Sequence, residues 1–279
     1  MITDGVQLNV ELAGAGYPLL LLHGFTGGAA TWHPVMSTLR EFRTIAPDLI
    51  GHGASDAPGD ESRYAMACCV SDVVAILDAL GVERAAVLGY SMGGRVALQF
   101  ALAAPERVAA LVLESASPGI DDRDERGGRV AADRALADSI ERGGVAAFVD
   151  AWEDLPLWST QARLPGRVRA SLRVQRLRNS ALGLANSLRG MGAGAQEPVL
   201  GRLGELAMPV LLIAGGEDKK YRDLAAAMQE RIAGARAHIV EGAGHAVHLE
   251  RPPAFARLVK EFLTSCLPHQ QQPVRSDRR

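Results

Sequence analysis

The sequence predicts an α/β fold in which helices cover a mostly parallel sheet, and two observations indicate this class. Short apolar runs bounded by glycine and proline alternate with segments of helical periodicity, a pattern typical of strand–helix–strand units. The composition is that of an ordinary globular protein, because 48% of the 279 residues are hydrophobic and 22% are charged. A chain of this length and composition can bury a core.

Seven apolar runs are expected to form strands, and five segments of helical periodicity accompany them. The strands are expected at Gln7–Leu12, Pro18–Leu22, Arg43–Ala46, Ala85–Leu88, Val108–Glu114, Pro209–Ala214 and Ala237–Val240. The helices are expected near Thr31–Leu39, Tyr64–Leu80, Met92–Ala103, Tyr221–Ile232 and Pro253–Leu263.

The stretch from Asp121 to Leu200 breaks this alternation. It contains helical patterns interrupted by glycines and prolines, and no convincing strand, so we expect a helical insertion. Residues 1–120 and 201–267 are then expected to form the core, and residues 121–200 a helical cap. Residues 268–279 are polar and aperiodic, and we expect them to form a flexible tail.

The charge balance excludes several classes of partner. Thirty basic and 32 acidic side chains give a net charge of −2, so no global field attracts nucleic acid or an anionic membrane. No window reaches the roughly 18 apolar residues of a membrane span, and the first residues lack the pattern of a signal peptide. Cys68, Cys69 and Cys266 show no zinc spacing. We expect a cytoplasmic protein with no metal, no cofactor and no signal for an oligomeric state.

The segment Gly89-Tyr90-Ser91-Met92-Gly93 is the strongest local signal for chemistry. It follows an apolar run and precedes a helical one, which is the context in which a GxSxG turn raises a serine hydroxyl to the end of a strand. The free amides of the following helix favour negative charge that develops there. The structural alternative is a glycine-rich turn with a serine at the helix N-cap. We expect Ser91 to be the reacting hydroxyl.

A reacting serine needs a base and a carboxylate that orients the base. Asp218 follows a late apolar run and His245 follows the next, which is the chain order expected for this turn. Glu217 and Asp223 are alternatives for the acid, and His248 is the alternative for the base. His245 is favoured because three small residues before it let its loop approach the turn.

Backbone amides are the usual groups that stabilise an oxyanion. An apolar run ends in His23-Gly24-Phe25, a turn in which the Phe25 amide can point at the same place as the Met92 amide. We interpret His23 as a buried structural imidazole.

The insertion has an unusual charge pattern. From Thr160 to Ala195 it carries seven arginines and no carboxylate, at positions 163, 167, 169, 173, 176, 178 and 189. One interpretation is a solvated helix face in an arginine-rich protein. The other is a lid for a carboxylate or phosphate ligand, because the guanidinium fork matches such groups.

Taken together, these motifs resemble a known superfamily. The motifs HGF, DLIGHGAS and GYSMGGR, the strand-end Asp218 and the GAGH that ends at His245 resemble the α/β-hydrolase superfamily over nearly the whole chain. That resemblance implies an α/β-hydrolase fold with a helical cap inserted after the sixth strand. A narrower resemblance, over about residues 1–265, is to the MenH family of menaquinone biosynthesis. It is carried by GYSMGGR and by residues 114–119, 125–133, 152–153 and 177–192.

Members of the MenH family are 2-succinyl-6-hydroxy-2,4-cyclohexadiene-1-carboxylate synthases. The resemblance implies a carbon–oxygen lyase that eliminates pyruvate from a tricarboxylate, 2-succinyl-5-enolpyruvyl-6-hydroxy-3-cyclohexene-1-carboxylate. Ser91, Asp218 and His245 would form a catalytic triad that abstracts a proton. The amides of Phe25 and Met92 would hold the charge that develops on the succinyl ketone.

The same resemblance implies a set of substrate-binding residues. These are Tyr90, Arg95, Arg129, Trp152 and Arg178. Arg126 competes with Arg129 for its role, and Arg189 is a further candidate. Two other functions stay open from the sequence, namely a serine hydrolase of carboxylic esters or carbon–carbon bonds and a non-catalytic binding module.

Overall fold

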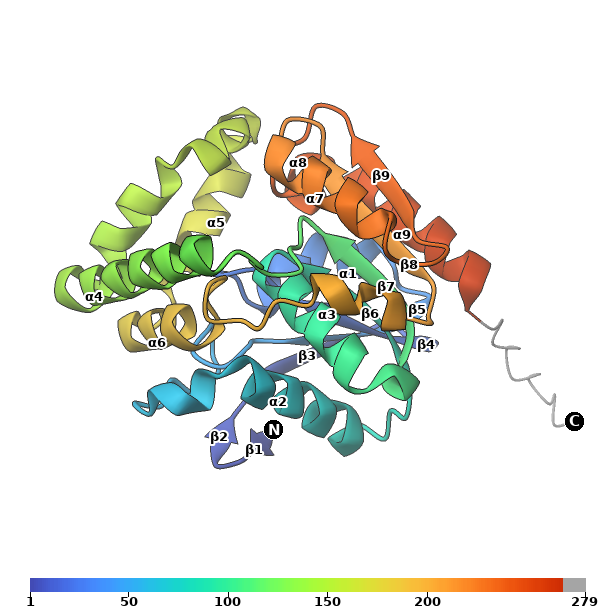
Figure 1. Ribbon diagram of the computed structural model, residues 1–279, viewed down its shortest axis with the longest axis horizontal. Coiled ribbons are helices and arrows are strands. Elements are labelled where there is room, and N and C mark those ends of the chain that lie inside the picture. Colours follow the sequence, from blue (N-terminus) through green and yellow to red (C-terminus); the bar gives the residue numbers. More distant parts are fainter. Residues whose placement is uncertain (268–279) are drawn as a thin grey trace, which may run out of the picture.

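Seven strands form the central sheet of the computed structural model, which describes residues 1–267 (Figure 1). The tail expected at residues 268–279 lies outside the described residues. The strands of the sheet are β3 (Val10–Ala13), β4 (Tyr17–Leu22), β5 (Phe42–Pro47), β6 (Ala85–Tyr90), β7 (Val108–Glu114), β8 (Val210–Gly215) and β9 (Arg236–Val240).

The strands lie in the order β3-β5-β4-β6-β7-β8-β9. The edge strand β3 is antiparallel to β5, and every other neighbouring pair is parallel. All residues of the central strands β6 and β7 are buried, as expected for parallel strands covered on both faces. Because the parallel strands end at the same edge of the sheet, the loops that follow them meet there.

Helices cover both faces of this sheet, and each face has its own apolar cluster. One face packs against α2 (Met66–Ala79), α3 (Met92–Ala103) and α7 (Lys219–Gln229). The other packs against α1 (His33–Thr38), α8 (Val247–Glu250) and α9 (Pro252–Cys266). Short 3-10 helices lie at Ala29–Trp32, Glu61–Tyr64, Pro105–Arg107 and Leu200–Glu205. Among residues 1–267, none of the helices combines the length and apolar composition needed to cross a membrane.

The N-terminus departs from the single strand expected at Gln7–Leu12. A separate ribbon of β1 (Ile2–Thr3) and β2 (Val6–Gln7) precedes β3. The turn between β1 and β2 is Asp4-Gly5, with φ of 44° and 74°, which is the Asp-Gly hairpin that a two-residue loop favours. The helical cap follows β7, which is the fifth strand of the large sheet along the chain and not the sixth that the family resemblance implies.

Residues 121–200 contain helices and no strand, which confirms the helical insertion. They form α4 (Arg123–Glu153), a 3-10 segment η4 (Pro156–Arg163), α5 (Gly166–Leu177) and α6 (Ala181–Met191). The long helix α4 breaks at Gly144, whose φ of 77° lies in the left-handed region. A small apolar cluster of α4 and α6 packs within this segment. The exact boundaries expected between core and cap, at residues 120/121 and 200/201, stay a prediction.

Close backbone contact seats α6 against the loop after β5. A Cβ added at Gly183 would lie 2.2 Å from the Gly51 carbonyl oxygen. Beside this contact, the Asn179 side chain donates a hydrogen bond to the Thr26 carbonyl oxygen at 3.0 Å and accepts one from the Gly53 N–H at 3.0 Å. The helical insertion therefore lies over the edge where the parallel strands end.

Replacing Gly183 with alanine should destabilise the protein, although alanine usually stabilises a helix. The added methyl group meets backbone atoms that cannot rotate away, and overpacking of this kind costs roughly 1–3 kcal/mol. The matched control is Gly128→Ala in α4, where nothing lies within 4 Å of the new methyl group and a gain of about 0.5–1 kcal/mol is expected. Urea unfolding of both variants measures this, and a gain in stability for Gly183→Ala would contradict the close contact.

Candidate active site

Ser91 lies at a sharp turn between β6 and α3. Its φ of 51° and ψ of −109° are unusual for a residue with a side chain and cost of order 1–3 kcal/mol. Glycines make the turn possible, since a Cβ at Gly89 would lie 2.4 Å from the Gly93 carbonyl oxygen and one at Gly93 would lie 2.1 Å from the Leu22 carbonyl oxygen. The strained turn places the Ser91 hydroxyl at the end of the sheet, as the GxSxG pattern predicts.

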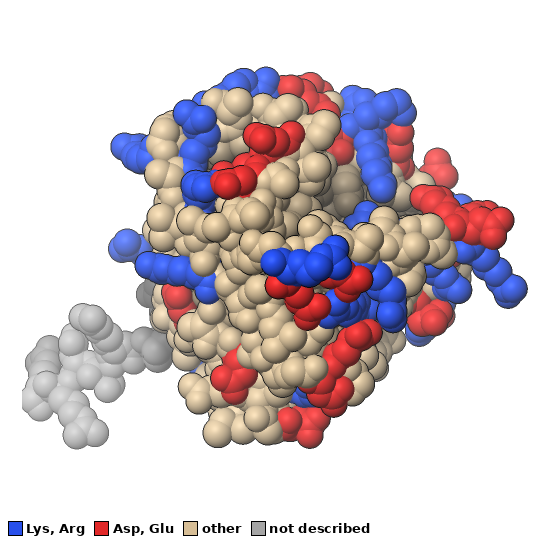
Figure 2. Space-filling model, turned by 90° about the vertical axis from the view of Figure 1, so that its left-hand side faces the viewer, with Lys and Arg blue, Asp and Glu red and all other residues tan. Residues whose placement is uncertain are grey.

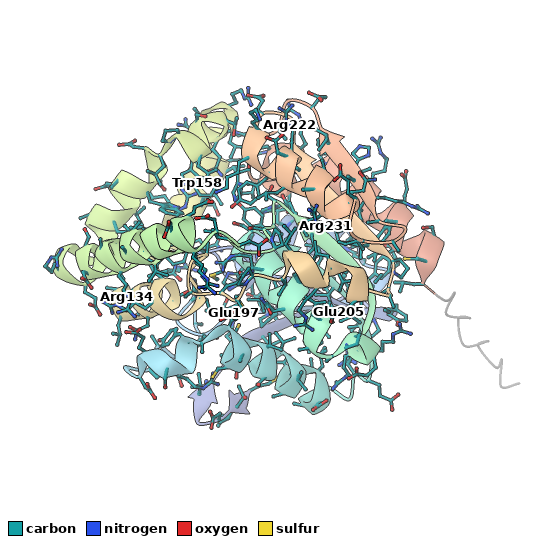
Figure 3. All side chains as sticks on the ribbon, in the orientation of Figure 1. Arg134, Trp158, Glu197, Glu205, Arg222 and Arg231 are labelled. Atoms are coloured by element: carbon teal, nitrogen blue, oxygen red, sulfur yellow. The ribbon has the colours of Figure 1, made fainter. Side chains whose placement is uncertain are left out.

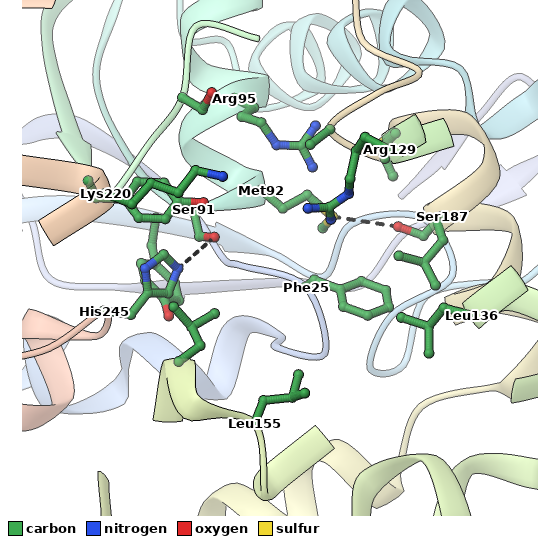
Figure 4. A pocket seen from close by; sticks show the side chains of 18 of the residues that line it. Phe25, Ser91, Met92, Arg95, Arg129, Leu136, Leu155, Ser187, Lys220 and His245 are labelled. Atoms are coloured by element: carbon green, nitrogen blue, oxygen red, sulfur yellow. Dashed lines mark hydrogen bonds between the residues drawn. The ribbon is translucent and has the colours of Figure 1, made fainter. Parts of the chain in front are cut away.

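Ser91, His245 and Asp218 are joined by hydrogen bonds, of which Figure 4 shows the one between Ser91 and His245. The Ser91 Oγ lies 3.0 Å from His245 Nε2, and His245 Nδ1 lies 2.7 Å from Asp218 Oδ2. Asp218 follows β8 and caps α7, where its carboxylate also accepts a hydrogen bond from the Tyr221 N–H at 3.4 Å. Three loops at the ends of parallel strands thus bring together residues that are up to 154 positions apart.

The two alternative acids are engaged elsewhere. Glu217 pairs with Arg163 at 2.7 Å, and Asp223 pairs with Lys219 at 2.6 Å on the exposed side of α7. Neither carboxylate contacts His245 among the interactions of the described residues. The geometry therefore favours Asp218 over both alternatives.

His248, the alternative base, belongs to a buried pair behind the turn. Its Nδ1 lies 2.9 Å from each carboxylate oxygen of Glu114, and its N–H donates to the same group at 2.9 Å. The ring packs against Trp32 and Tyr90, with centroid separations of 5.0 and 4.6 Å. Glu114 and His248 are both almost fully buried. His248 thus holds the end of β7 and does not reach Ser91.

The amides expected to bind an oxyanion have no other acceptor. Within residues 1–267, neither the Phe25 N–H nor the Met92 N–H donates a hydrogen bond. The loop before Phe25 is fixed by His23, whose Nε2 accepts from the Leu49 N–H at 2.9 Å and whose Nδ1 therefore donates to the Gly24 carbonyl oxygen at 2.8 Å. Burial lowers the pKa of His23, so that imidazole is neutral. This is the structural role expected for it.

A cavity of about 300 Å³ opens beside Ser91 and His245. Its charged lining consists of Arg95, Arg129 and Lys220, and no Asp or Glu of the described residues lines it. Aromatic side chains provide much of the remaining wall, namely those of Phe25, Tyr90, Trp152, Trp158 and Tyr221. The cavity thus combines three cations with apolar surface, which suits a ligand with several carboxylates on a carbon ring.

Arg95 is a buried cation that no carboxylate neutralises. Its Nη1 donates to the Gln196 Oε1 at 2.9 Å, and only 9% of the residue is exposed. Burial lowers the pKa of Arg95 to about 10, so the guanidinium remains charged at neutral pH. Figure 4 shows the side chain extending into the cavity.

Arg129, on α4, is the second arginine in the cavity, and Arg126 is not. Arg129 Nε donates to Asp133 Oδ1 at 2.8 Å, one helical turn further along α4. Arg126 lies 3.8 Å from the Glu197 carboxylate, outside the cavity lining. The geometry favours Arg129 over its competitor.

Arg178 is not among the residues that line this cavity, and its expected contact with a substrate stays a prediction. It is the exposed C-cap of α5. Two residues along a helix correspond to about 200°, so Arg178 points away from the side that Arg176 buries. Arg176 instead faces the interior of the cap, 2.9 Å from Glu153 and 3.2 Å from Gln161.

The arginine-rich run is a solvated and ion-paired face. None of its seven arginines lines the cavity, and Arg189, the further candidate, pairs with Asp138 and Glu141. Figure 2 shows basic and acidic side chains interspersed over the cap side of the molecule. The two arginines of this cavity come from α3 and α4, so the cavity lining does not support the interpretation of the run as a carboxylate-binding lid, which stays a prediction.

Sequence reasoning missed Lys220 and Tyr221, which reach the cavity from the first turn of α7. The Tyr221 ring lies 4.5 Å from the His245 ring, and burial raises the pKa of its hydroxyl. Their position in the sequence could have indicated this, because they lie two and three residues after Asp218, in the first turn of the helix that follows a strand end. Ser187 of α6 was also missed; its hydroxyl donates to the Met92 sulfur at 3.5 Å.

Two tryptophans of the cap cover the reacting groups. The Trp158 ring lies 5.5 Å from the His245 ring and extends from η4 towards the core (Figure 3). Trp152, one of the residues expected at the substrate, lies 5.5 Å from the Phe25 ring. Tyr90, expected there too, lies 5.5 Å from the His245 ring. These rings restrict the access of water to His245.

Comparison with known proteins identifies the family. A family model described as the alpha/beta hydrolase fold matches residues 17–252. A Bacillus subtilis (strain 168) protein, provisionally named as a 2-succinyl-6-hydroxy-2,4-cyclohexadiene-1-carboxylate synthase, is 45% identical over 95% of this chain and 97% of its own. The solved structure of MenH from S. aureus matches with a TM-score of 0.88 and 31% identity, over 92% of this chain and 98% of that one. The chain belongs to the MenH family of the α/β-hydrolase fold.

A synthase of the same name from Serratia proteamaculans (strain 568) is 32% identical over 88% of this chain and 93% of its own. The match therefore spans both the sheet and the helical insertion of this MenH-family chain. It confirms the family and the fold class expected from the motifs.

Replacing His248 with alanine should affect stability far more than a surface histidine does. The change leaves Glu114 buried without its partner, and breaking a buried pair costs roughly 3–5 kcal/mol. His33 is the matched control, because its pair with Glu11 is exposed and should contribute less than about 1 kcal/mol. Denaturant unfolding distinguishes the two. Similar small losses for both variants would show that the His248 pair does not support the fold.

Proposed function

We propose that this chain is a carbon–oxygen lyase of menaquinone biosynthesis. It eliminates pyruvate from 2-succinyl-5-enolpyruvyl-6-hydroxy-3-cyclohexene-1-carboxylate to give 2-succinyl-6-hydroxy-2,4-cyclohexadiene-1-carboxylate. This is the activity in the name of the Bacillus and Serratia relatives. The observation that carries the proposal is the cavity beside Ser91, which is lined by three cations and by no carboxylate of the described residues. A tricarboxylate compensates those three charges in a partly desolvated space.

Ser91, His245 and Asp218 supply the proton transfer. Asp218 orients His245, which removes the proton of the Ser91 hydroxyl, and the serine oxygen takes a proton from the substrate carbon next to the succinyl ketone. The electron pair of the broken carbon–hydrogen bond at ring carbon 2 first forms the enolate of the succinyl ketone. When the enolate returns to the ketone, a double bond forms between ring carbons 2 and 3 and the existing double bond moves from carbons 3 and 4 to carbons 4 and 5. The bond between carbon 5 and the enolpyruvyl oxygen breaks in that step, and the released enolate becomes pyruvate when it takes a proton. No bond forms between Ser91 and the substrate.

The amides of Phe25 and Met92 stabilise the enolate that develops at the succinyl ketone. Both are free to donate, and Met92 begins α3, whose N-terminus favours negative charge. Arg95, Arg129 and Lys220 hold the carboxylates, with Tyr90 and Trp152 against the ring. We place the reaction in the cytoplasm because Cys68, Cys69 and Cys266 are free thiols, which persist in a reducing compartment.

Substitution of the hydrogen-bonded residues tests the proposed chemistry. Ser91→Ala, Asp218→Asn and His245→Ala should each lower the rate of pyruvate release about 10²- to 10⁴-fold, because each removes part of one positioned proton transfer. The measurement couples pyruvate release to the appearance of diene absorbance. Near-normal release by His245→Ala would overturn the assignment of the base.

The same assay separates the lyase from a serine hydrolase. Simple aryl esters should be turned over poorly, since they carry no carboxylates to pair with the cations of the cavity. A burst of acyl-enzyme with aryl esters, together with no pyruvate from the cyclohexene substrate, would assign the chain to the hydrolases instead.

The cavity cations should contribute far more than the exposed arginines of the cap. Arg95→Ala leaves a substrate carboxylate unpaired at a buried position, which costs roughly 2–5 kcal/mol, or about 30- to 3,000-fold in kcat/KM. Arg129→Ala and Lys220→Ala should give smaller losses, because the Arg129 side chain is 45% exposed and already pairs with Asp133, and the Lys220 ammonium is exposed. Arg95→Lys should restore part of the activity, since lysine keeps the charge but lacks the fork.

Arg163→Ala and Arg167→Ala are the controls, because both side chains are exposed and outside the cavity. Their kcat/KM should change little at two salt concentrations. Equal and salt-sensitive losses in all the variants would indicate diffuse attraction in place of a defined carboxylate site.

A further inference from the structure

The two arginines of the cavity are held by acceptors of different charge. Arg129 donates to the Asp133 carboxylate, which neutralises part of its charge. Arg95 donates to a neutral amide, the Gln196 Oε1, at 2.9 Å. Gln196 belongs to the loop that follows α6, and it is 1% exposed.

The orientation of the Gln196 amide is fixed by Arg95. A guanidinium has only donors, so the amide oxygen faces it and the amide nitrogen points away. That buried Nε2 has no hydrogen-bond partner in the described part of the chain. An unsatisfied buried donor is unfavourable. A glutamate of the same shape would remove the unpaired donor and would neutralise the guanidinium.

We propose that Gln196 is a positioning residue that fixes Arg95 through a neutral acceptor, so that the full charge of the guanidinium stays available to a substrate carboxylate. This inference rests on the proposed function, in which Arg95 binds one of three carboxylates. The neutral amide keeps Arg95 in place in the free enzyme and does not compete with the ligand for its charge. A glutamine at position 196 therefore makes the fold less stable than a glutamate would, but it preserves the affinity of Arg95 for a substrate carboxylate.

The surroundings of Arg95 agree with this role. Burial is the main cause of its lowered pKa, and the nearby Arg129 lowers the pKa further, so the bare guanidinium is electrostatically unfavourable until an anion arrives. Asp133 is the nearest acid that acts on Arg95, and its Oδ1 is engaged by Arg129. The free energy that a carboxylate ligand gains at Arg95 is correspondingly large.

Two substitutions at position 196 separate charge from packing. Gln196→Glu keeps the shape and adds a charge, whereas Gln196→Met keeps the length and removes the acceptor. Gln161→Glu is the matched control, because the Gln161 Oε1 also accepts from a buried arginine, Arg176, at 3.2 Å. Arg176 does not line this cavity and already pairs with Glu153, so a second carboxylate beside it should leave ligand binding unchanged.

The measurement is the Kd of citrate, an unreactive tricarboxylate, by calorimetry, together with the thermal unfolding midpoint of each variant. Gln196→Glu should bind citrate at least about 30-fold more weakly than the natural chain, while its unfolding midpoint stays equal or rises. Gln196→Met should lose clearly less affinity, since Arg95 keeps its charge. Gln161→Glu should bind citrate as the natural chain does. The kcat/KM for the cyclohexene substrate should follow the same order.

Three results would overturn the inference. These are unchanged citrate affinity in Gln196→Glu, an equal loss in Gln196→Met, or no citrate binding by the natural chain. Citrate binding needs no turnover, so its outcome is independent of the reaction. A chain that showed the expected order of affinities but released no pyruvate would contradict the proposed function and still support the role of Gln196.

Discussion

The backbone conformation of Ser91 is the constraint on which the site depends. A positive φ at a residue with a side chain persists only where its neighbours enforce it. Here the Ser91 N–H donates to the Glu114 carbonyl oxygen at 2.9 Å, and backbone of β4 lies where a side chain at position 93 would be. The strain is supported by the central parallel strands, which are the most deeply buried part of the sheet.

Because this turn belongs to the core, the core and the helical insertion supply different groups to the site. The core supplies the hydroxyl, the base, its orienting acid and the two free amides, all at the carboxyl ends of strands. The insertion supplies Arg129, the tryptophans over His245 and the loop that carries Gln196. The first set serves acyl transfer or proton abstraction equally well. Substrate preference therefore depends on the second set together with Arg95 of α3 and Lys220 of α7, which the core supplies.

The sequence predicted the core well because glycine spacing and apolar runs are local signals with strict backbone consequences. The strand Val108–Glu114 and the helix Met92–Ala103 have the expected limits, and the order of Ser91, Asp218 and His245 fits the geometry. The insertion was harder to predict, because α5 buries a single residue, Arg176. A run of arginines does not indicate which side of such a helix faces the interior. The direction in which Arg178 points could not be predicted for that reason.

Gln196 had no signal of its own, because its role exists only where a loop 101 residues away meets Arg95. The arrangement also explains why a count of arginines was a poor guide to the ligand. A cation held by a carboxylate has already met its counter-charge, as Arg173 and Arg189 have, whereas one held by an amide has not. Arg129 lies between the two cases, because it lines the cavity and yet pairs with Asp133. The charge of the protein partner therefore sets how much of an arginine's charge is left for a ligand, and that property appears only when the fold brings the two side chains together.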